Sequence, residues 1–140
     1  MRTLLGGLVL TVTVVVTMVV AGCVSLRPVA PVVDAPGGVR VLLAAVDDDR
    51  FRVDVVNYGR QPIVVDGDRV VLITPAGTRP HRTGGAGGRD RIAPGGRHCL
   101  QLRFALGGIH AGERVAISLD GAVTLDGQPL PVPPLELVAD

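Results

Sequence analysis

The 140-residue sequence contains no tryptophan and no lysine, and it has few aromatic residues of any kind. Two phenylalanines and one tyrosine are its only aromatic residues, so a folded core must be built almost entirely from aliphatic side chains. All fourteen basic residues are arginines, and thirteen acidic residues balance them to a formal net charge of +1. Because nucleic-acid-binding domains are usually strongly basic, this balance argues against DNA or RNA as a partner.

The sequence also lacks the pattern of an α-helix after residue 22. No stretch of twelve residues there carries a helical apolar stripe free of glycine and proline. From Val39 onward, apolar and polar residues alternate instead, which is typical of half-buried strands. The predicted strands are 39–43, 51–57, 63–65, 69–74, 98–104, 115–119, 122–125, 128–130 and 135–138. Seven to nine short strands without a helix predict an all-β sandwich or barrel.

Recognisable catalytic motifs are lacking as well. The chain has two serines, Ser25 and Ser118, and neither lies in a nucleophile elbow. The glycine-rich run 84–88 is not followed by the Gly-Lys-Ser/Thr of a phosphate-binding loop. The acidic segments 47–49 and 66–68 lack the ligand spacing of an EF-hand. We therefore expect a protein that is not an enzyme and that has no cofactor or metal.

What the sequence does have is a distinct amino-terminal segment. Arg2 supplies a positive charge, the uncharged apolar run 4–20 follows, and Ala21 and Gly22 are small. These features are typical of a secretory signal peptide, predicted here as residues 1–22. A 17-residue helix at ~1.5 Å per residue is shorter than the ~30 Å hydrocarbon core of a bilayer. This length favours a cleaved peptide over the alternative, an uncleaved anchor.

The last residues of this segment, Val20-Ala21-Gly22-Cys23, resemble the lipobox of bacterial lipoproteins. The resemblance implies that a signal peptidase recognises Val20, Ala21 and Gly22 and that Cys23 carries a diacylglycerol. Two or three acyl chains make a lasting membrane anchor. Residue 24 is Val rather than the Asp that often retains lipoproteins at the inner membrane. This implies the periplasmic face of the outer membrane in a bacterium with two membranes, and otherwise the outer face of the cell membrane.

Residues 23–38 are predicted to be the lipidated cysteine and a flexible tether, and residues 39–140 to be the folded domain. Pro28, Pro31, Pro36 and the Gly37-Gly38 pair disfavour regular strand pairing in this stretch. About 14 extended residues would reach at most ~50 Å. We therefore expect the domain to stand clear of the lipid headgroups.

A second resemblance lies within the predicted strands. Residues 53–65, VDVVNYGRQPIVV, resemble the V-x-V-x-N-x-G-x-x-P-x-x-V strand-turn-strand of bacterial immunoglobulin-like domains. Ile92-Ala93-Pro94-Gly95 is similar to a later turn of these domains. The resemblance implies an immunoglobulin-like β-sandwich over roughly residues 39–120. In the first motif, we expect Asn57 and Gly59 to adopt left-handed turn conformations.

Cys99 is the only cysteine besides Cys23, and a thioether at Cys23 would leave it unpaired. It could form a thiolate or soft-metal site with His81, His98 or His110. As neighbours on a strand, His98 and Cys99 themselves point to opposite faces. The apolar face of strand 98–104 excludes Cys99, so we expect its thiol to be partly accessible.

A cationic surface is predicted around residues 79–97, where five arginines accompany one aspartate. The arginines are Arg79, Arg82, Arg89, Arg91 and Arg97. We expect them to be exposed beside a mobile, glycine-rich segment, 83–90, from which they could contact anionic headgroups or envelope glycans. The alternative is that they only reflect the arginine-rich, lysine-free composition of the whole chain.

The sequence thus predicts a lipid-anchored envelope protein, a non-catalytic module that contacts the membrane through Cys23 and binds a protein or an envelope polymer. The alternative is a metal-handling or thiol-redox accessory protein that uses Cys99 with the histidines.

Overall fold

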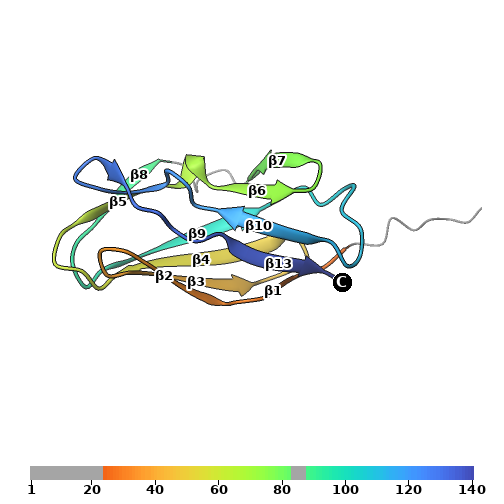
Figure 1. Cartoon of the computed structure of the whole chain (residues 1–140), viewed down its shortest axis with the longest axis horizontal. Helices are drawn as coiled ribbons and strands as arrows, with labels where there is room; N and C mark the ends of the chain where they lie inside the picture. Colours follow the sequence, from red (N-terminus) through yellow and green to blue (C-terminus); the bar gives the residue numbers. More distant parts are fainter. Residues whose placement is uncertain (1–23, 83–87) are drawn as a thin grey trace, which may run out of the picture.

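The computed structural model describes residues 24–82 and 88–140 (Figure 1). This part of the chain contains thirteen strands, one 3₁₀ turn and no α-helix. The strands are β1 (Leu26–Pro28), β2 (Val32–Ala35), β3 (Val39–Ala45), β4 (Arg50–Asn57), β5 (Ile63–Asp66), β6 (Val71–Thr74), β7 (Gly77–Pro80), β8 (Arg89–Ile92), β9 (Arg97–Arg103), β10 (Arg114–Ser118), β11 (Val123–Leu125), β12 (Gln128–Pro129) and β13 (Leu135–Ala139). The strand predicted for 69–74 begins two residues later, because the 3₁₀ turn Gly67–Arg69 precedes it.

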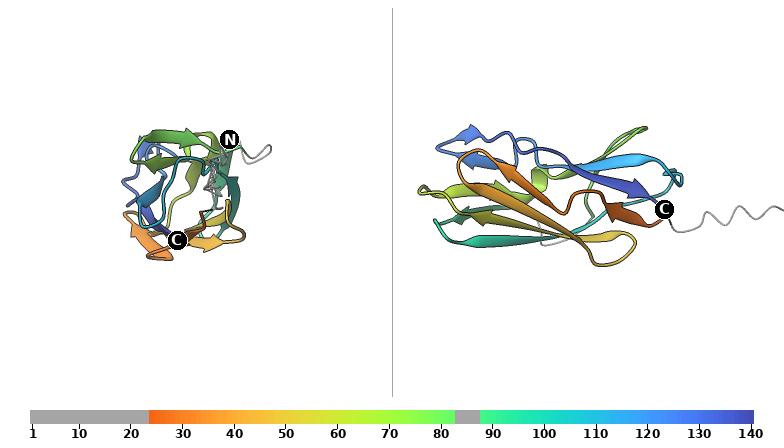
Figure 2. Two further views of the ribbon diagram at one scale, coloured as in Figure 1. Left: turned by 90° about the vertical axis from the view of Figure 1, so that its right-hand side faces the viewer. Right: turned by 60° about the horizontal axis from the view of Figure 1, so that its bottom comes forward.

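The strands form three antiparallel sheets that enclose a common interior (Figure 2). Their orders are β1-β13-β10-β6-β7, β12-β11-β5-β8 and β2-β3-β4-β9. This β-sandwich-like arrangement confirms the all-β prediction. The number of strands exceeds the predicted seven to nine, and the additional strands are β1, β2, β7 and β8.

The core is aliphatic, as the composition requires. Phe51 and Phe104 are its only aromatic residues, with ring centroids 6.2 Å apart, while Tyr58 is exposed. Strand β4 shows why the alternation was informative: Phe51 and Val53 are buried on one face, and Arg52 is exposed on the other. An inward-facing side chain every second residue is what a sheet packed on one face requires.

The predicted tether is wrong for residues 26–28 and 32–35, which form paired strands. Strand β1 pairs with β13, from Leu26 opposite Ala139 to Pro28 opposite Leu137, and β2 pairs with β3. Leu26 is 1% exposed and belongs to the core. The proline-based argument failed because β1 lies at the edge of its sheet, where one side of the strand needs no N–H donor.

The antiparallel register places both ends of the described chain together. The Asp140 N–H donates to the Ser25 carbonyl over 2.8 Å, and Arg27 pairs with the Asp140 carboxylate at 3.4 Å. The loops 46–49, 75–76 and 104–113 lie at this same end, which we call the terminus end (Figure 1). The turns 36–38, 58–62, 93–96 and 126–127 form the opposite end, which we call the Tyr58 end.

The buried side chain of Asn57 holds the Tyr58 end together. Its Nδ2 donates to the carbonyls of Gln61, over 2.8 Å, and Ile92, over 3.1 Å, and its Oδ1 accepts from the Gly59 N–H at 3.0 Å. The Asn57 backbone also exchanges two hydrogen bonds with the 93–96 turn. The two segments that resemble immunoglobulin-like motifs therefore form one structural unit.

The structure gives Asn57 and Gly59 a different role in the motif from the one expected. Neither Asn57 nor Gly59 has a positive φ, so neither adopts the left-handed conformation that we expected. Asn57 acts through its side chain, and Gly59 provides space. A Cβ at Gly59 would collide with the Gly37 carbonyl oxygen, and a Cβ at Gly38 would lie 2.8 Å from the Gly59 Cα.

We expect Asn57→Ala to lower the free energy of unfolding of the domain by about 2–4 kcal/mol. The substitution removes the partner of the Gln61 and Ile92 carbonyls and of the Gly59 N–H, and each unsatisfied buried group costs ~1–3 kcal/mol. Urea unfolding measures the change. Gln61→Ala is the control, since it removes only an exposed side chain and keeps the carbonyl that Asn57 binds; it should change stability by less than about 0.5 kcal/mol. Equal effects of the two substitutions would contradict the role of Asn57.

Candidate functional site

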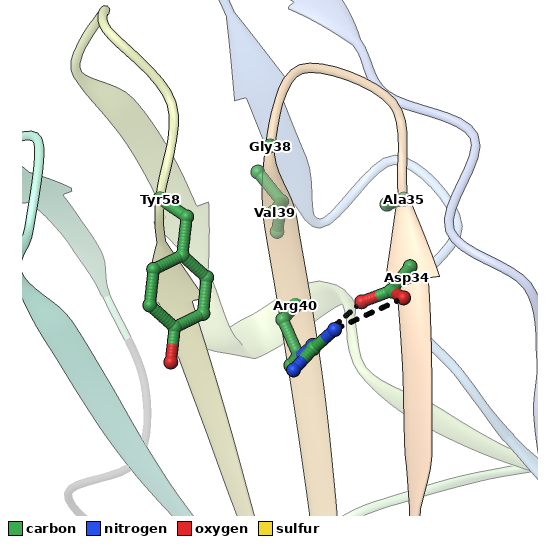
Figure 3. Close-up of a pocket in the computed structure, with 6 residues that line it drawn as sticks. All are labelled: Asp34, Ala35, Gly38, Val39, Arg40 and Tyr58. Atoms are coloured by element: carbon green, nitrogen blue, oxygen red, sulfur yellow. Dashed lines mark hydrogen bonds and ion pairs between the residues drawn. The ribbon is translucent and has the colours of Figure 1, made fainter.

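A shallow depression of about 440 Å³ lies on the outer face of β2 and β3, next to the Tyr58 end (Figure 3). Its lining residues are Asp34, Ala35, Gly38, Val39, Arg40 and Tyr58. They come from β2, from β3 and its preceding turn, and from the residue that follows β4. The depression therefore exists only when all three segments are in register.

An ion pair and an aromatic ring define the chemistry of this depression. Arg40 and Asp34 are opposite each other in the β2–β3 register, and the Arg40 Nε and Nη2 donate to the two carboxylate oxygens over 2.7 and 3.3 Å. The hydrogen bond from Arg40 lowers the pKa of the Asp34 carboxyl, and Asp34 raises the pKa of Arg40. The Arg40 guanidinium lies 5.8 Å from the centre of the Tyr58 ring.

The backbone fixes these three side chains relative to one another. Gly37 and Gly38 both have φ +79°, which lets the chain turn between β2 and β3 and bring Asp34 opposite Arg40. The Tyr58 N–H donates to the Gly38 carbonyl over 2.8 Å. Tyr58 is therefore attached to this turn on one side and follows the buried Asn57 on the other.

The depression combines an aromatic surface with polar hydrogen-bonding groups. The Tyr58 side chain offers an aromatic surface that is 66% exposed. Arg40 has further N–H donors and Asp34 has further acceptor sites beyond those of their mutual contact. Because the two charges neutralise each other, the surface favours a polar or aromatic partner over a strongly charged one.

The sequence patterns did not identify Asp34, Arg40 and Tyr58 as site residues. Asp34 was placed in the tether 23–38, so Arg40 and Tyr58 had no predicted partner. A signal was nevertheless present. Pro36-Gly37-Gly38 separates Val32-Val33 from the alternating Val39-Arg40-Val41, and a turn signal between two β-branched runs predicts a hairpin. A hairpin at this position would have placed Asp34 opposite Arg40.

Cys99 lies on the outer face of β9, opposite Asp54 of β4. The nearly buried Asp54 carboxylate lies 3.2 Å from the guanidinium groups of both Arg52 and Arg97. Cys99 is half-buried and free, which confirms the prediction that its thiol is partly accessible. Burial raises the pKa of the Cys99 thiol, and Asp54 raises it further while Arg52 opposes the effect. A raised pKa disfavours the reactive thiolate.

The structure does not bring the three histidines to Cys99. The His81 Nε2 lies 2.8 Å from the Gly67 carbonyl, the His98 Nε2 lies 3.2 Å from an Asp90 carboxylate oxygen, and His110 is exposed in the 104–113 loop. Within residues 24–82 and 88–140, no three His, Cys, Asp or Glu residues are grouped so that they could hold a metal ion.

The five arginines predicted to form a cationic surface do not lie on one sheet: four are divided among β7, β8 and β9, and Arg82 follows β7 outside any strand. Arg79 is half-buried and donates to the Ala105 carbonyl over 2.7 Å, so its expected exposure is wrong. The other four are exposed. Arg89 and Arg91 lie on the same side of β8, whereas Arg97 belongs to β9 in another sheet, beside Asp54. Residues 83–87 lie outside the described residues, as do Cys23 and the three residues before it.

We expect Cys99 to react with a thiol-specific disulfide reagent more slowly in the native protein than in the protein unfolded by urea. The raised pKa of the native thiol leaves less thiolate at a given pH. Labelling rates between pH 7 and 10 measure the difference. A pKa raised by folding stabilises the native state below the ordinary thiol pKa, and this stabilisation is lost as the pH rises through the native pKa. Cys99→Ser, the control, should lack this component of the alkaline loss. Equal rates in native protein and urea would contradict the prediction.

Comparisons with protein-family models, with characterised proteins and with solved structures find no match for this chain. Within the described ranges, no helix has the length and apolar character needed to cross a bilayer.

Proposed function

We propose that this protein is a lipid-anchored, non-catalytic binding module of a bacterial cell envelope. A diacylglycerol on Cys23 would hold it at the membrane, and a protein or an envelope polymer would be its partner. The lipobox-like residues Val20, Ala21 and Gly22 before Cys23 support the anchor. No nucleic acid is proposed as a partner, because the chain carries a formal net charge of only +1.

We propose that the sandwich is of the immunoglobulin-like type. The support is the pair of turn motifs at residues 53–65 and 92–95, together with their contact through Asn57. Immunoglobulin-like folds carry many unrelated functions. The fold type alone therefore does not identify the partner, and the binding surface must be located by its own chemistry.

The observation that carries the proposed binding function is the depression formed by Asp34, Arg40 and Tyr58. It combines a 66%-exposed aromatic ring with a charge-neutral polar pair, and the backbone hydrogen bond from Tyr58 to Gly38 holds the two together. Tyrosine and arginine are enriched among the residues that contribute most to binding at protein interfaces. We assign this depression as the contact surface. The alternative, metal handling or thiol redox chemistry, has less support, because His81 contacts the Gly67 carbonyl and His98 contacts the Asp90 carboxylate.

The proposed anchor predicts that the mature protein has the mass of residues 23–140 plus its acyl chains and partitions into detergent. Cys23→Ser should leave an unprocessed precursor without acyl mass, because the sulfur that carries the lipid is lost. Cys99→Ser is the matched control and should be processed and lipidated normally. Mass spectrometry of the three proteins decides, and an unchanged mature mass in Cys23→Ser would disprove the anchor.

The proposed contact surface predicts that a photo-crosslinking amino acid at position 58 captures a specific envelope component in native membranes, because that side chain lies in the depression. The same amino acid at Ile73 is the control, since Ile73 is 41% exposed on β6, outside the depression. Gel shifts of the crosslinked proteins measure capture, and Arg40→Ala should reduce the adduct formed at position 58. Identical adducts at positions 58 and 73 would rule out the depression as the contact surface.

A further inference from the structure

We infer that the terminus end of the sandwich rests directly on the lipid headgroups, so that the membrane surface is its partner and the Tyr58 end points away from the bilayer. This inference rests on the proposed lipid at Cys23. It replaces the expectation, based on a tether, that the domain stands clear of the headgroups.

The first argument is the length of chain between the lipidated residue and the fold. Only Val24 and Ser25 separate Cys23 from Leu26, the first residue of β1. Three Cα-to-Cα steps span at most about 11 Å. The polar layer on each side of a bilayer is roughly 5–7 Å thick, from the ~30 Å hydrocarbon core and the ~40–45 Å total thickness. A cysteine whose acyl chains enter the hydrocarbon therefore holds Leu26 at the headgroup surface.

The second argument is that this start of the chain is attached firmly to the domain. Leu26 is buried, and all three residues of β1 are in register with β13. The Ser25 carbonyl accepts from the Asp140 N–H over 2.8 Å, and the Val29 N–H donates to the Glu136 carbonyl over 2.9 Å. Val24 itself packs against the core. No described residue before β1 is therefore left to act as a long linker.

The third argument concerns the surface of the terminus end, which would face the membrane. The exposed residues of the terminus end include Val46, which is 62% exposed, and His110 and Ala111 in the 104–113 loop. Its charges are of both signs: Asp47 lies 3.1 Å from Arg50, and Asp49 lies 3.5 Å from Arg103. The further basic residues Arg82, beside Val46, and Arg114 are accompanied by the acidic residues Asp48 and Glu113. A surface of this kind has no strong attraction to anionic lipids. We therefore attribute its position to the short attachment, and expect it to be the same on uncharged and anionic bilayers.

The same geometry places the proposed contact surface far from the bilayer. Strand β4 runs from Arg50, near the terminus end, to Asn57 at the Tyr58 end, and eight residues of strand span about 26 Å. The depression with Asp34 and Arg40 would then face the space beyond the membrane. Arg97 lies at the start of β9, near this far end, and so would not reach the headgroups.

The experiment uses the full lipidated protein in phosphatidylcholine vesicles that contain a headgroup spin label. In a Cys99→Ser background, a fluorophore is attached at Ala111→Cys, at the terminus end, or at Gln61→Cys, at the Tyr58 end; both positions are exposed. We expect the spin label to quench the fluorophore at position 111 at least several-fold more than the one at position 61. Inserting 30 Gly/Ser residues between Cys23 and Val24 is the control. Such a linker spans about 30 Å and should abolish the difference.

Mass spectrometry of the same preparations tests the proposed anchor separately from the inferred orientation. Acylated protein with equal quenching at positions 111 and 61, or with stronger quenching at position 61, would overturn the inference and leave the proposed anchor intact. A difference that appears only on anionic vesicles would also overturn it, since charge would then position the domain. Protein without acyl mass would remove both the proposed anchor and the inference.

Discussion

The buried amide of Asn57 is the interaction on which the candidate site depends. It connects the turn after β4 with the carbonyl at the end of β8, and its own backbone binds the turn before β9. With that turn held, Gly59 can approach Gly38 at a distance that no Cβ would allow. Tyr58 lies between these two contacts. The position of the aromatic ring beside Arg40 thus follows from a polar group buried beneath it, whose hydrogen bonds would be costly to leave unmade.

A second constraint acts at the other end of the molecule, where β1 closes the edge of the five-stranded sheet. The burial of Leu26 and the pairing of β1 with β13 bring the start of the described chain next to Asp140. A lipoprotein with a long tether could present any face to its partners. If Cys23 carries the proposed lipid, only Val24 and Ser25 would separate it from β1. The domain would then be held in one orientation, with the proposed contact surface on the side opposite the membrane.

Sequence patterns predicted every described strand that is paired on both sides but missed four of the six edge strands, and the reason is physical. β4 is paired on both sides and packed on its inner face, so Phe51, Val53 and Arg52 alternate clearly. The four strands that were missed, β1, β2, β7 and β8, are all edge strands. An edge strand has one unpaired side and buries little, so it tolerates Pro28 or Pro80 and needs no strict alternation. Proline near a strand is therefore weak evidence for a tether.

The sequence by itself determined the aliphatic core, the all-β class and the outward phase of Cys99, because each depends on composition or on the two-residue period of a strand. It also supplied the lipobox-like residues on which the proposed anchor rests. Only the tertiary structure decided which strands lie at the edges and that Asp34, Arg40 and Tyr58 meet. It also decided that His81 contacts Gly67 and His98 contacts Asp90. These features depend on pairing between residues distant in the sequence, such as Asn57 with Ile92 and Leu26 with Ala139. A local pattern carries no information about such pairs, because the free energy of an edge strand or a turn comes from the neighbour it contacts.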